Sequence, residues 1–225
     1  MTEPSHRLVL GIDTSTTVNV GLAWDGEVLA TGSIGDSRAH VEQLMPLVQH
    51  CLADGRRKLR EVDQIVVGLG PGPFTGLRVG VVTAGVLAAA LSLPLHGICS
   101  LDVLAAQHVR DAAPALGDFL VTTDARRREV YWARYDPAGR RVGGPYVNPP
   151  AELPRLPTVG PAVDLYPDRL LGVPGPRRLD PGVLAAMGSN LPTAGSEPLY
   201  LRRADATEPT RRKSVLAHRQ PRVRG

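Results

Sequence analysis

Residues 64–93 decide the fold, and they read QIVVGLGPGPFTGLRVGVVTAGVLAAALSL. The β-branched residues 65–67 stand in a run too short for a helix and predict a central strand that ends near Gly68. Residues 70–73 interrupt regular structure, because proline removes a backbone donor and glycine adopts backbone angles closed to other residues. Thr75 is then the expected N-cap of a helix over residues 76–92. The stretch therefore predicts a strand, a loop and a helix in succession.

The helix predicted over residues 76–92 consists mostly of small side chains. Gly76, Gly80, Ala84 and Ala88 are spaced four residues apart and therefore lie in one row on one face. Such a row lets another backbone approach closely. We expect this face to have a close neighbour.

The glycine loop fits neither of two familiar nucleotide motifs. A Walker loop needs Lys followed by Ser or Thr after its last glycine, whereas Gly76 is followed by Leu77 and Arg78. The dinucleotide fingerprint fails as well, because Pro73 or Thr75 stands where its third glycine belongs. The residues alone leave a ligand-facing loop and a structural turn equally open.

The apolar helix is too short to predict a membrane span. The uncharged run between Arg78 and Pro94 covers only residues 79–93, whereas a bilayer needs about 20 residues. A buried helix of a globular core explains the run better, and we expect no membrane association. The N-terminal residues show neither a signal peptide nor an anchor, which favours the cytoplasm.

Composition predicts two aliphatic cores in this chain of 225 residues. Hydrophobic residues make up 43% of the chain, but only two Phe, two Trp and five Tyr are present. Cys51 and Cys99 stand in apolar stretches without the spacing of a disulfide framework, which suits buried thiols in a reducing compartment.

The net charge of +4 is concentrated at the C-terminus. Residues 202–225 hold eight Arg or Lys against two acidic residues, so the rest of the chain is slightly acidic. A terminal run of this kind is more often a mobile extension than a nucleic-acid contact.

The N-terminal residues predict a β-hairpin. Apolar runs flank Asp25 and Gly26, a pair typical of a tight turn in which both residues have positive φ. Asp13, Thr14 and Ser15 form a polar turn after the first strand. The Asp13 carboxylate could face a metal-bound phosphate there, although receiving local backbone donors is the commoner role.

Further helices and strands follow from periodicity and turn residues. Residues 39–54 predict an amphipathic helix with His40 as a capping or solvent-facing residue. A short strand after residue 94 precedes a helix that Ser100 is expected to cap. Residues 118–136 predict two strands joined by a charged, solvated turn, and a second domain begins there. In residues 137–200 only short strands, loops and a helix near 181–187 are expected.

The sequence lacks the motifs of a self-sufficient catalytic site. None of the nine serines stands in a Gly-x-Ser-x-Gly elbow. The six histidines form neither a His-x-x-x-His nor a His-Glu-x-x-His pair. His96 and Cys99 are better explained as core residues than as metal ligands.

Several segments together resemble the TsaB (YeaZ) family, the bacterial partner subunits that help to make N6-threonylcarbamoyladenosine at position 37 of tRNA. The segments are LGIDTST (10–16), SRAHVEQLMPLV (37–48), GLGPGPFTGLRVG (68–80), TDARRREVYWARY (123–135) and EPLYLRRADAT (197–207). Pro73 replaces a serine of the family's loop signature, and Arg128 stands where a glycine is common. Residues 137–196 match weakly.

The resemblance implies an α/β, actin-like ATPase fold related to ribonuclease H, with two lobes whose mixed sheets are flanked by helices. We expect the first lobe over residues 1–103, with part of 205–217 as a candidate to complete it. A second, smaller lobe is expected over 104–204 and a basic tail over 208–225.

The resemblance also implies a non-catalytic scaffold or activator that works with the catalytic paralogue TsaD and the ATPase TsaE. TsaD binds metal through a His-x-x-x-His pair, whereas the corresponding residues 95–104 hold one histidine, so we expect neither a metal nor a catalytic residue here. The expected partners are TsaD, TsaE and, through the complex, tRNA. A homodimer is expected for the chain alone, with no tightly bound cofactor and only weak or complex-dependent ATP or ADP.

The resemblance places the partner interface on the two first-lobe helices. The expected interface residues are His40, Leu44, Leu47, Val48, Thr75, Arg78, Gly80, Ala84 and Ala88. The glycine loop supplies Gly70, Gly72, Phe74 and Gly76, and the vestigial phosphate turn supplies Asp13, Thr14 and Ser15.

Two rival functions remain open on the sequence. An independent ATP-binding kinase or ATPase is compatible with the fold and with Asp13, but residues 137–200 show no second phosphate loop or adenosine-binding glycine motif. A glycoprotease of the M22 type would need a metal or nucleophile that the sequence lacks.

Overall fold

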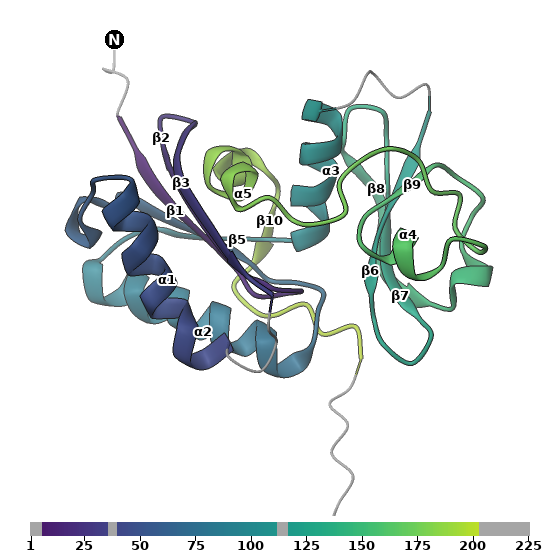
Figure 1. Cartoon of the computed structure of the whole chain (residues 1–225), viewed down its shortest axis with the longest axis horizontal. Coiled ribbons are helices and arrows are strands. Elements are labelled where there is room, and N and C mark those ends of the chain that lie inside the picture. Colours follow the sequence, from purple (N-terminus) through teal and green to yellow (C-terminus); the bar gives the residue numbers. More distant parts are fainter. Residues whose placement is uncertain (1–5, 36–39, 112–116, 203–225) are drawn as a thin grey trace, which may run out of the picture.

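A computed structural model describes residues 6–35, 40–111 and 117–202, which form two sheets with helices packed against them (Figure 1). The strands are β1 (Leu8–Asp13), β2 (Val18–Trp24), β3 (Glu27–Ile34), β4 (Gln64–Gly68), β5 (Leu95–Ile98), β6 (Phe119–Asp124), β7 (Val130–Tyr135), β8 (Arg141–Asn148), β9 (Thr158–Val159) and β10 (Thr193–Gly195). The helices are α1 (His40–Asp54), α2 (Phe74–Leu91), α3 (Ser100–Asp111), α4 (Ala162–Leu165) and α5 (Pro181–Met187).

The first sheet has the strand order β10-β5-β4-β1-β2-β3. Strands β1 to β3 are antiparallel neighbours, whereas β4 is parallel to β1 and β5 is parallel to β4. Asp25 and Gly26 have φ angles of 50° and 82° in the turn between β2 and β3. The predicted hairpin and the predicted central strand over residues 64–68 are therefore confirmed.

The second sheet repeats the strand plan of the first. Its order is β8-β7-β6-β9, with β6 to β8 antiparallel and β9 parallel to β6. This arrangement matches β3-β2-β1-β4 strand for strand. The α/β, two-lobed actin-like fold predicted from the sequence is confirmed.

Three hydrophobic cores separate the layers. In the first core, helices α1 and α2 cover the face of the first sheet to which Leu8, Leu10 and Ile12 point. The second core lies between the two sheets, where α3 and α5 meet Val9 and residues of the second sheet. The third core covers the outer face of the second sheet beside α4. Alternation along β1 thus assigns successive residues to opposite cores.

The predicted boundary between the lobes is wrong, because residues from the expected second lobe complete the first. Strand β10 pairs with β5, and α5 packs across β1 and β2 (Figure 1). The approach is so close that a Cβ on Gly21 would lie 1.9 Å from the carbonyl oxygen of Pro181. The apolar face of the first sheet needs a cover, and residues 181–199 supply it. Residues 205–217 and the predicted tail 208–225 lie outside the described residues.

Helix α2 begins at Phe74, two residues earlier than the sequence predicted. Pro73 occupies the N-cap position and no side chain caps the helix, so the prediction of Thr75 as N-cap is wrong. Among the described residues, α2 is the one helix long and apolar enough to cross a membrane by length and composition alone. Its Ala84 and Ala88 belong to the first core, which makes it a covering helix of this lobe.

Candidate functional site

The row of small residues on α2 receives the polar turn that follows β1. Thr14 Oγ1 donates to the carbonyl oxygen of Gly76 at 2.7 Å and accepts from the backbone N–H of Gly80 at 3.2 Å. A Cβ on Gly80 would lie 2.3 Å from Thr14 Oγ1. The hydroxyl is therefore inserted into the hydrogen-bond ladder of the helix, and the close neighbour predicted for this row is the chain's own turn.

Asp13 is enclosed at the same junction. The residue is fully buried, and its carboxylate accepts from Ser15 N at 2.8 Å, Ser15 Oγ at 2.7 Å and Ser100 Oγ at 2.5 Å. Burial raises the pKa of Asp13, and the hydrogen bonds from Ser100 and Ser15 oppose that rise. The carboxylate therefore serves the local backbone and hydroxyl donors and does not face solvent.

Ser100 ties this turn to the glycine loop. Its Oγ accepts from Gly70 N at 3.1 Å, and its backbone N–H donates to the Gly70 carbonyl at 2.8 Å. Because Ser100 is the first residue of α3 and its hydroxyl bonds to Asp13, the prediction that it caps α3 is wrong. Residues 13, 70 and 100 are far apart in the sequence, so no local pattern predicts this network.

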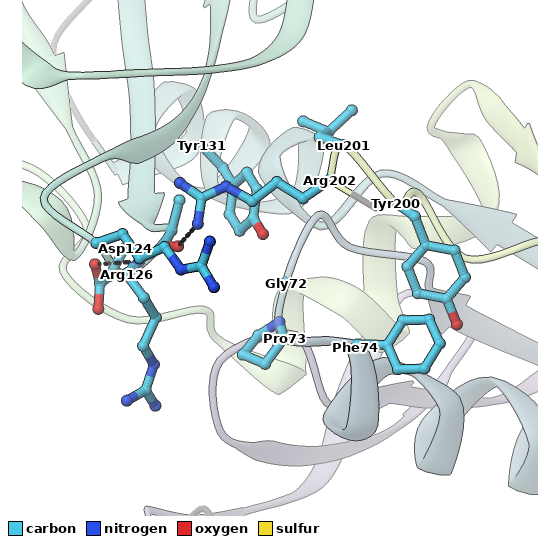
Figure 2. A pocket seen from close by; sticks show the side chains of 11 residues that line it. Gly72, Pro73, Phe74, Asp124, Arg126, Tyr131, Tyr200, Leu201 and Arg202 are labelled. Atoms are coloured by element: carbon cyan, nitrogen blue, oxygen red, sulfur yellow. Dashed lines mark hydrogen bonds between the residues drawn. The ribbon is translucent and has the colours of Figure 1, made fainter. Parts of the chain in front are cut away.

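The inner side of the glycine loop is structural and its outer side lines a cleft. A Cβ on Gly72 would lie 2.4 Å from the carbonyl oxygen of Ser15, so the loop rests directly on the turn. The same glycine, with Pro73 and Phe74, forms one wall of a cleft between the lobes with a volume of about 460 Å³ (Figure 2). The remaining lining residues are Asp124, Ala125, Arg126, Arg127, Tyr131, Tyr200, Leu201 and Arg202. The loop therefore acts as a structural turn on its inner side, and a ligand-facing role of its outer side stays a prediction.

The opposite wall of the cleft is the turn between β6 and β7. Arg126, Arg127 and Arg128 have φ angles of 59°, 55° and 61°, so three successive residues with side chains adopt the left-handed conformation. Each such residue costs about 1–2 kcal/mol relative to right-handed backbone. The charged turn predicted here is confirmed, and its three arginines are exposed.

Hydrogen bonds hold this turn in place. Asp124 Oδ1 accepts from Arg126 N at 2.8 Å, and Glu129 N donates to the Arg126 carbonyl at 3.0 Å. From the C-terminal side, Arg202 donates to the Ala125 carbonyl at 3.0 Å and forms an ion pair with Glu129. Figure 2 shows Arg202 reaching across the cleft to the turn.

An aromatic pair lies at the other end of the cleft. The rings of Phe74 and Tyr200 are 4.7 Å apart between centroids (Figure 2). The guanidinium of Arg78 lies 3.7 Å from the Phe74 ring centroid, and Arg78 Nε donates to Tyr200 Oη at 3.2 Å. Tyr200 is 39% exposed.

A second buried carboxylate lies away from this cleft and was not singled out by the sequence. Asp102 Oδ1 accepts from Tyr135 Oη at 2.7 Å and lies 3.1 Å from Arg141 Nε. Burial raises the pKa of Asp102, and Tyr135 and Arg141 oppose that rise. Asp102 and Arg141 also line a second cavity of about 800 Å³. A pairing between α3 and β8 carries no local sequence signal.

Most of the predicted interface residues are packed inside the chain. Leu44, Leu47, Val48, Gly80, Ala84 and Ala88 are all buried. The expectation that they face a partner is wrong for the described chain, because α1 and α2 use these residues to cover the first sheet. Thr75 and Arg78 are exposed, and the side chain of His40 lies outside the described residues.

The exposed apolar residues of α2 lie on its other side. Val82 and Val86 are each 61% exposed, and they are four residues apart. Sequence reasoning missed them because it took the small residues as the outward face. Their i, i+4 spacing was the available signal.

The described residues contain no group of three His, Cys, Asp or Glu that could hold a metal ion. His96 Nε2 lies 3.0 Å from the Leu191 carbonyl oxygen, and Cys51 and Cys99 are buried free thiols. Cys51 and Cys99 are core residues as predicted, whereas His96 is only half-buried and was wrongly expected in the core.

Comparison with known proteins identifies the family. Residues 35–177, more than half of the chain, match the family model described as TsaD: tRNA N6-adenosine threonylcarbamoyltransferase. An uncharacterized protein of Mycobacterium tuberculosis is 43% identical over 204 residues, which cover 88% of this chain and 93% of the relative. The tRNA threonylcarbamoyladenosine biosynthesis protein TsaB of Escherichia coli is 36% identical over 128 residues, covering 56% of this chain and 54% of that protein.

A solved structure agrees with these relatives. YeaZ from Pseudomonas aeruginosa superimposes with a TM-score of 0.73 at 26% sequence identity, over 87% of this chain and 100% of that chain. One family accounts for the loop signature, the two-lobed fold and the relatives. The chain belongs to the TsaB/YeaZ family.

Proposed function

We propose that this chain is a non-catalytic subunit of the machinery that makes N6-threonylcarbamoyladenosine in tRNA. In this role it activates a TsaD-like catalytic paralogue, and a TsaE-like ATPase is the third component in the cytoplasm. The names of the TsaB relatives and of the matching family model support a place in this modification pathway. The proposal that this chain is the non-catalytic subunit rests on the geometry of the turn after β1.

The enclosure of Asp13 is the observation that carries the non-catalytic role. In an actin-like ATPase, a carboxylate at this position could meet a metal-bound phosphate. Here Ser15 and Ser100 occupy it with three hydrogen bonds, and Gly72 rests on Ser15. A phosphate would have to displace these donors and reopen a buried junction, which costs free energy. The turn therefore acts as a packing element, and we propose no tightly bound nucleotide.

The outer face of α2 is the surface that we propose for the TsaD-like partner. Val82 and Val86 expose apolar side chains on neighbouring turns, which is the pattern that a partner helix can cover. Helix α1 packs beside α2 and extends the same layer (Figure 1). Without the paralogue, the same surface would support the homodimer, and tRNA would bind through the complex.

Reconstitution with purified components tests this proposal. We expect product only when the chain and its TsaD-like and TsaE-like partners are present together with ATP, the precursors of the threonylcarbamoyl group and tRNA. Elemental analysis after dialysis should find no stoichiometric transition metal in the chain alone. Modification of tRNA by the isolated chain, or one tightly held zinc or iron per chain, would contradict the proposal.

A further inference from the structure

The turn between β6 and β7 presents an unusual density of positive charge. Arg126, Arg127 and Arg128, together called the arginine turn below, are consecutive and exposed. All three have positive φ, a conformation that residues with side chains rarely adopt in succession. Local strain that the surrounding contacts maintain is found preferentially at functional sites.

The acidic residues that flank the arginine turn help to hold its backbone in place. Asp124 accepts from the backbone N–H of Arg126, and Glu129 is paired with Arg202. Arg202 also holds the Ala125 carbonyl, which connects the turn to the C-terminal segment. These contacts fix the backbone of the turn, so its three side chains project from a defined position.

Aromatic rings lie across the cleft from the arginine turn. Phe74 and Tyr200 form a tilted pair at the far side of the cleft, and Tyr131 lies on the near side (Figure 2). Proteins that bind single-stranded RNA combine such rings, on which unstacked bases lie, with arginines that neutralise the backbone. The cleft, at about 460 Å³, has room for a base.

A polyanion explains the arrangement better than a small anionic ligand does. Arg128 belongs to the arginine turn but not to the cleft lining, so the positive surface continues outside the cavity. Inside the cavity, Asp124 adds a carboxylate and Arg202 is already paired, which weakens the site for a compact anion. A nucleic-acid strand could follow the charge out of the cleft.

We propose that the arginine turn and the cleft form a direct RNA contact of this chain, in which the arginines bind phosphates of a single-stranded loop. A base of that loop would stack on the exposed part of Tyr200, because Arg78 already covers the Phe74 ring. This inference rests on the proposed function, in which tRNA is the substrate of the complex, and it adds a role in holding that substrate.

The test measures binding of the full chain to an anticodon stem-loop RNA at several salt concentrations. One variant carries Arg126→Asn, Arg127→Asn and Arg128→Asn, because Asn tolerates the left-handed conformation better than most residues. A matched control carries Arg60→Asn, Arg155→Asn and Arg169→Asn, three exposed arginines elsewhere on the surface. Both variants lose three positive charges, so they differ only in the position of the substituted arginines.

The arginine-turn variant should bind at least about tenfold more weakly at 0.1 M salt, and the salt dependence should fall by about two to three units of slope. The control should change binding less than about twofold. Equal losses in both variants would overturn the proposal, because net charge alone would then explain binding. Unchanged binding in the arginine-turn variant would overturn it as well.

Two further measurements distinguish RNA binding in this cleft from binding elsewhere on the chain and from binding of a small anion. Tyr200→Ala should weaken RNA binding several-fold, whereas Tyr146→Ala, which removes an exposed tyrosine of the second lobe, should not. If the wild-type chain bound ATP weakly and the arginine-turn variant lost that binding but kept RNA binding, the cleft would be assigned to a small anion and the proposal overturned. Capture of the TsaD-like partner should be unaffected by these variants, so a failure of the proposed function would appear separately.

Discussion

Each of the two repeated lobes has a polar turn after its first strand, and the first of these turns is buried whereas the second is exposed. Strand β1 ends at Asp13 and strand β6 ends at Asp124, and each leads through a polar turn into the next antiparallel strand. Asp13 is fully buried and accepts three hydrogen bonds, whereas Asp124 is half-buried and fixes the backbone of an exposed turn. Gly72 lies between them, resting on Ser15 and lining the cleft toward Asp124.

Packing from the following helix explains the difference. Helix α2 offers Gly76 and Gly80 at the point where Thr14 inserts its hydroxyl, and α3 offers Ser100 to the carboxylate. In the second lobe, the connection after the parallel strand β9 leads to the short helix α4 (Ala162–Leu165). This helix packs on the outer face of the second sheet and does not cover the turn. The strand plan is the same in both lobes, but within the described residues only the first lobe has helices that enclose its turn.

Filling the space around Thr14 should cause the largest change in stability. Gly80→Ala would ordinarily stabilise a helix by about 1 kcal/mol, but here its Cβ would overlap Thr14 Oγ1. We expect a loss of about 3 kcal/mol in the free energy of unfolding, measured by urea denaturation. Gly85→Ala is the matched control, because nothing lies within 4 Å of its Cβ, and it should stabilise the protein.

A double-mutant cycle then identifies the cause of that loss. If overlap with Thr14 causes it, Gly80→Ala should cost much less in a Thr14→Ala background than in the wild type. Equal costs in both backgrounds would show that Thr14 does not enclose this side of the turn.

Enlarging the inner face of α2 should cause the next largest effect. Ala84 is fully buried in the first core, so Ala84→Leu should lower the free energy of unfolding by about 2 kcal/mol through overpacking. Ala90→Leu places the same group on an exposed position of the same helix and should be nearly neutral. Thermal or urea unfolding of the two variants measures the difference. A stable Ala84→Leu variant that fails to bind the partner would restore the interface predicted from the sequence.

A substitution in the exposed turn of residues 126–128 should instead increase stability. Arg128 has a φ of 61°, and glycine adopts this conformation without steric cost. We therefore expect Arg128→Gly to raise the free energy of unfolding by about 0.5–1 kcal/mol. Urea denaturation would show this as a higher midpoint. A loss of stability would mean that the Arg128 side chain holds the turn, contrary to its exposure.

The pH dependence of stability should separate the closed turn from the rest of the protein. Burial raises the pKa of Asp13 above its ordinary value of 3.8, so the folded protein binds this proton more tightly than the unfolded chain. The cost of burying the charge is absent below pH 3.8 and develops as pH rises through the folded value. The stability of Asp13→Asn relative to wild type should therefore increase as pH rises above about 4.

Urea denaturation between about pH 4 and about pH 8 tests this prediction. Asp102, whose pKa burial also raises, is present in both proteins, so its contribution cancels from the difference. A relative stability of Asp13→Asn that decreased with rising pH would mean that hydrogen bonds outweigh burial at this carboxylate.

Local patterns in the sequence predicted most of the first lobe. The Asp25-Gly26 turn, the strand at residues 64–68 and the helix near residues 181–187 formed where composition and turn chemistry placed them. The helix at 181–187 was located correctly but assigned to the wrong lobe. Local residue types predict that a short helix forms. They do not predict which sheet it covers, because that depends on contacts distant in sequence.

The site could be predicted only in part for the same reason. The loop of residues 70–76 and the turn of residues 13–15 were recognised by their residue types, but their contact through Thr14 and Ser100 was not. Periodicity showed that α2 has a small face and a larger one. It could not show that the small face is turned inward, because that depends on where β1 ends.

Product formation in the reconstituted reaction, compared between two variants, tests the central claim that the chain acts through the outer face of α2 and not through the closed turn. Val82→Asp with Val86→Asp should reduce formation of modified tRNA at least about tenfold at limiting protein, because charges would oppose an apolar contact. Asp13→Asn should retain most of the product, as should Val142→Asp on an exposed position of the second lobe. Loss of product in a folded Asp13→Asn variant, together with full product in the double variant on α2, would contradict this claim.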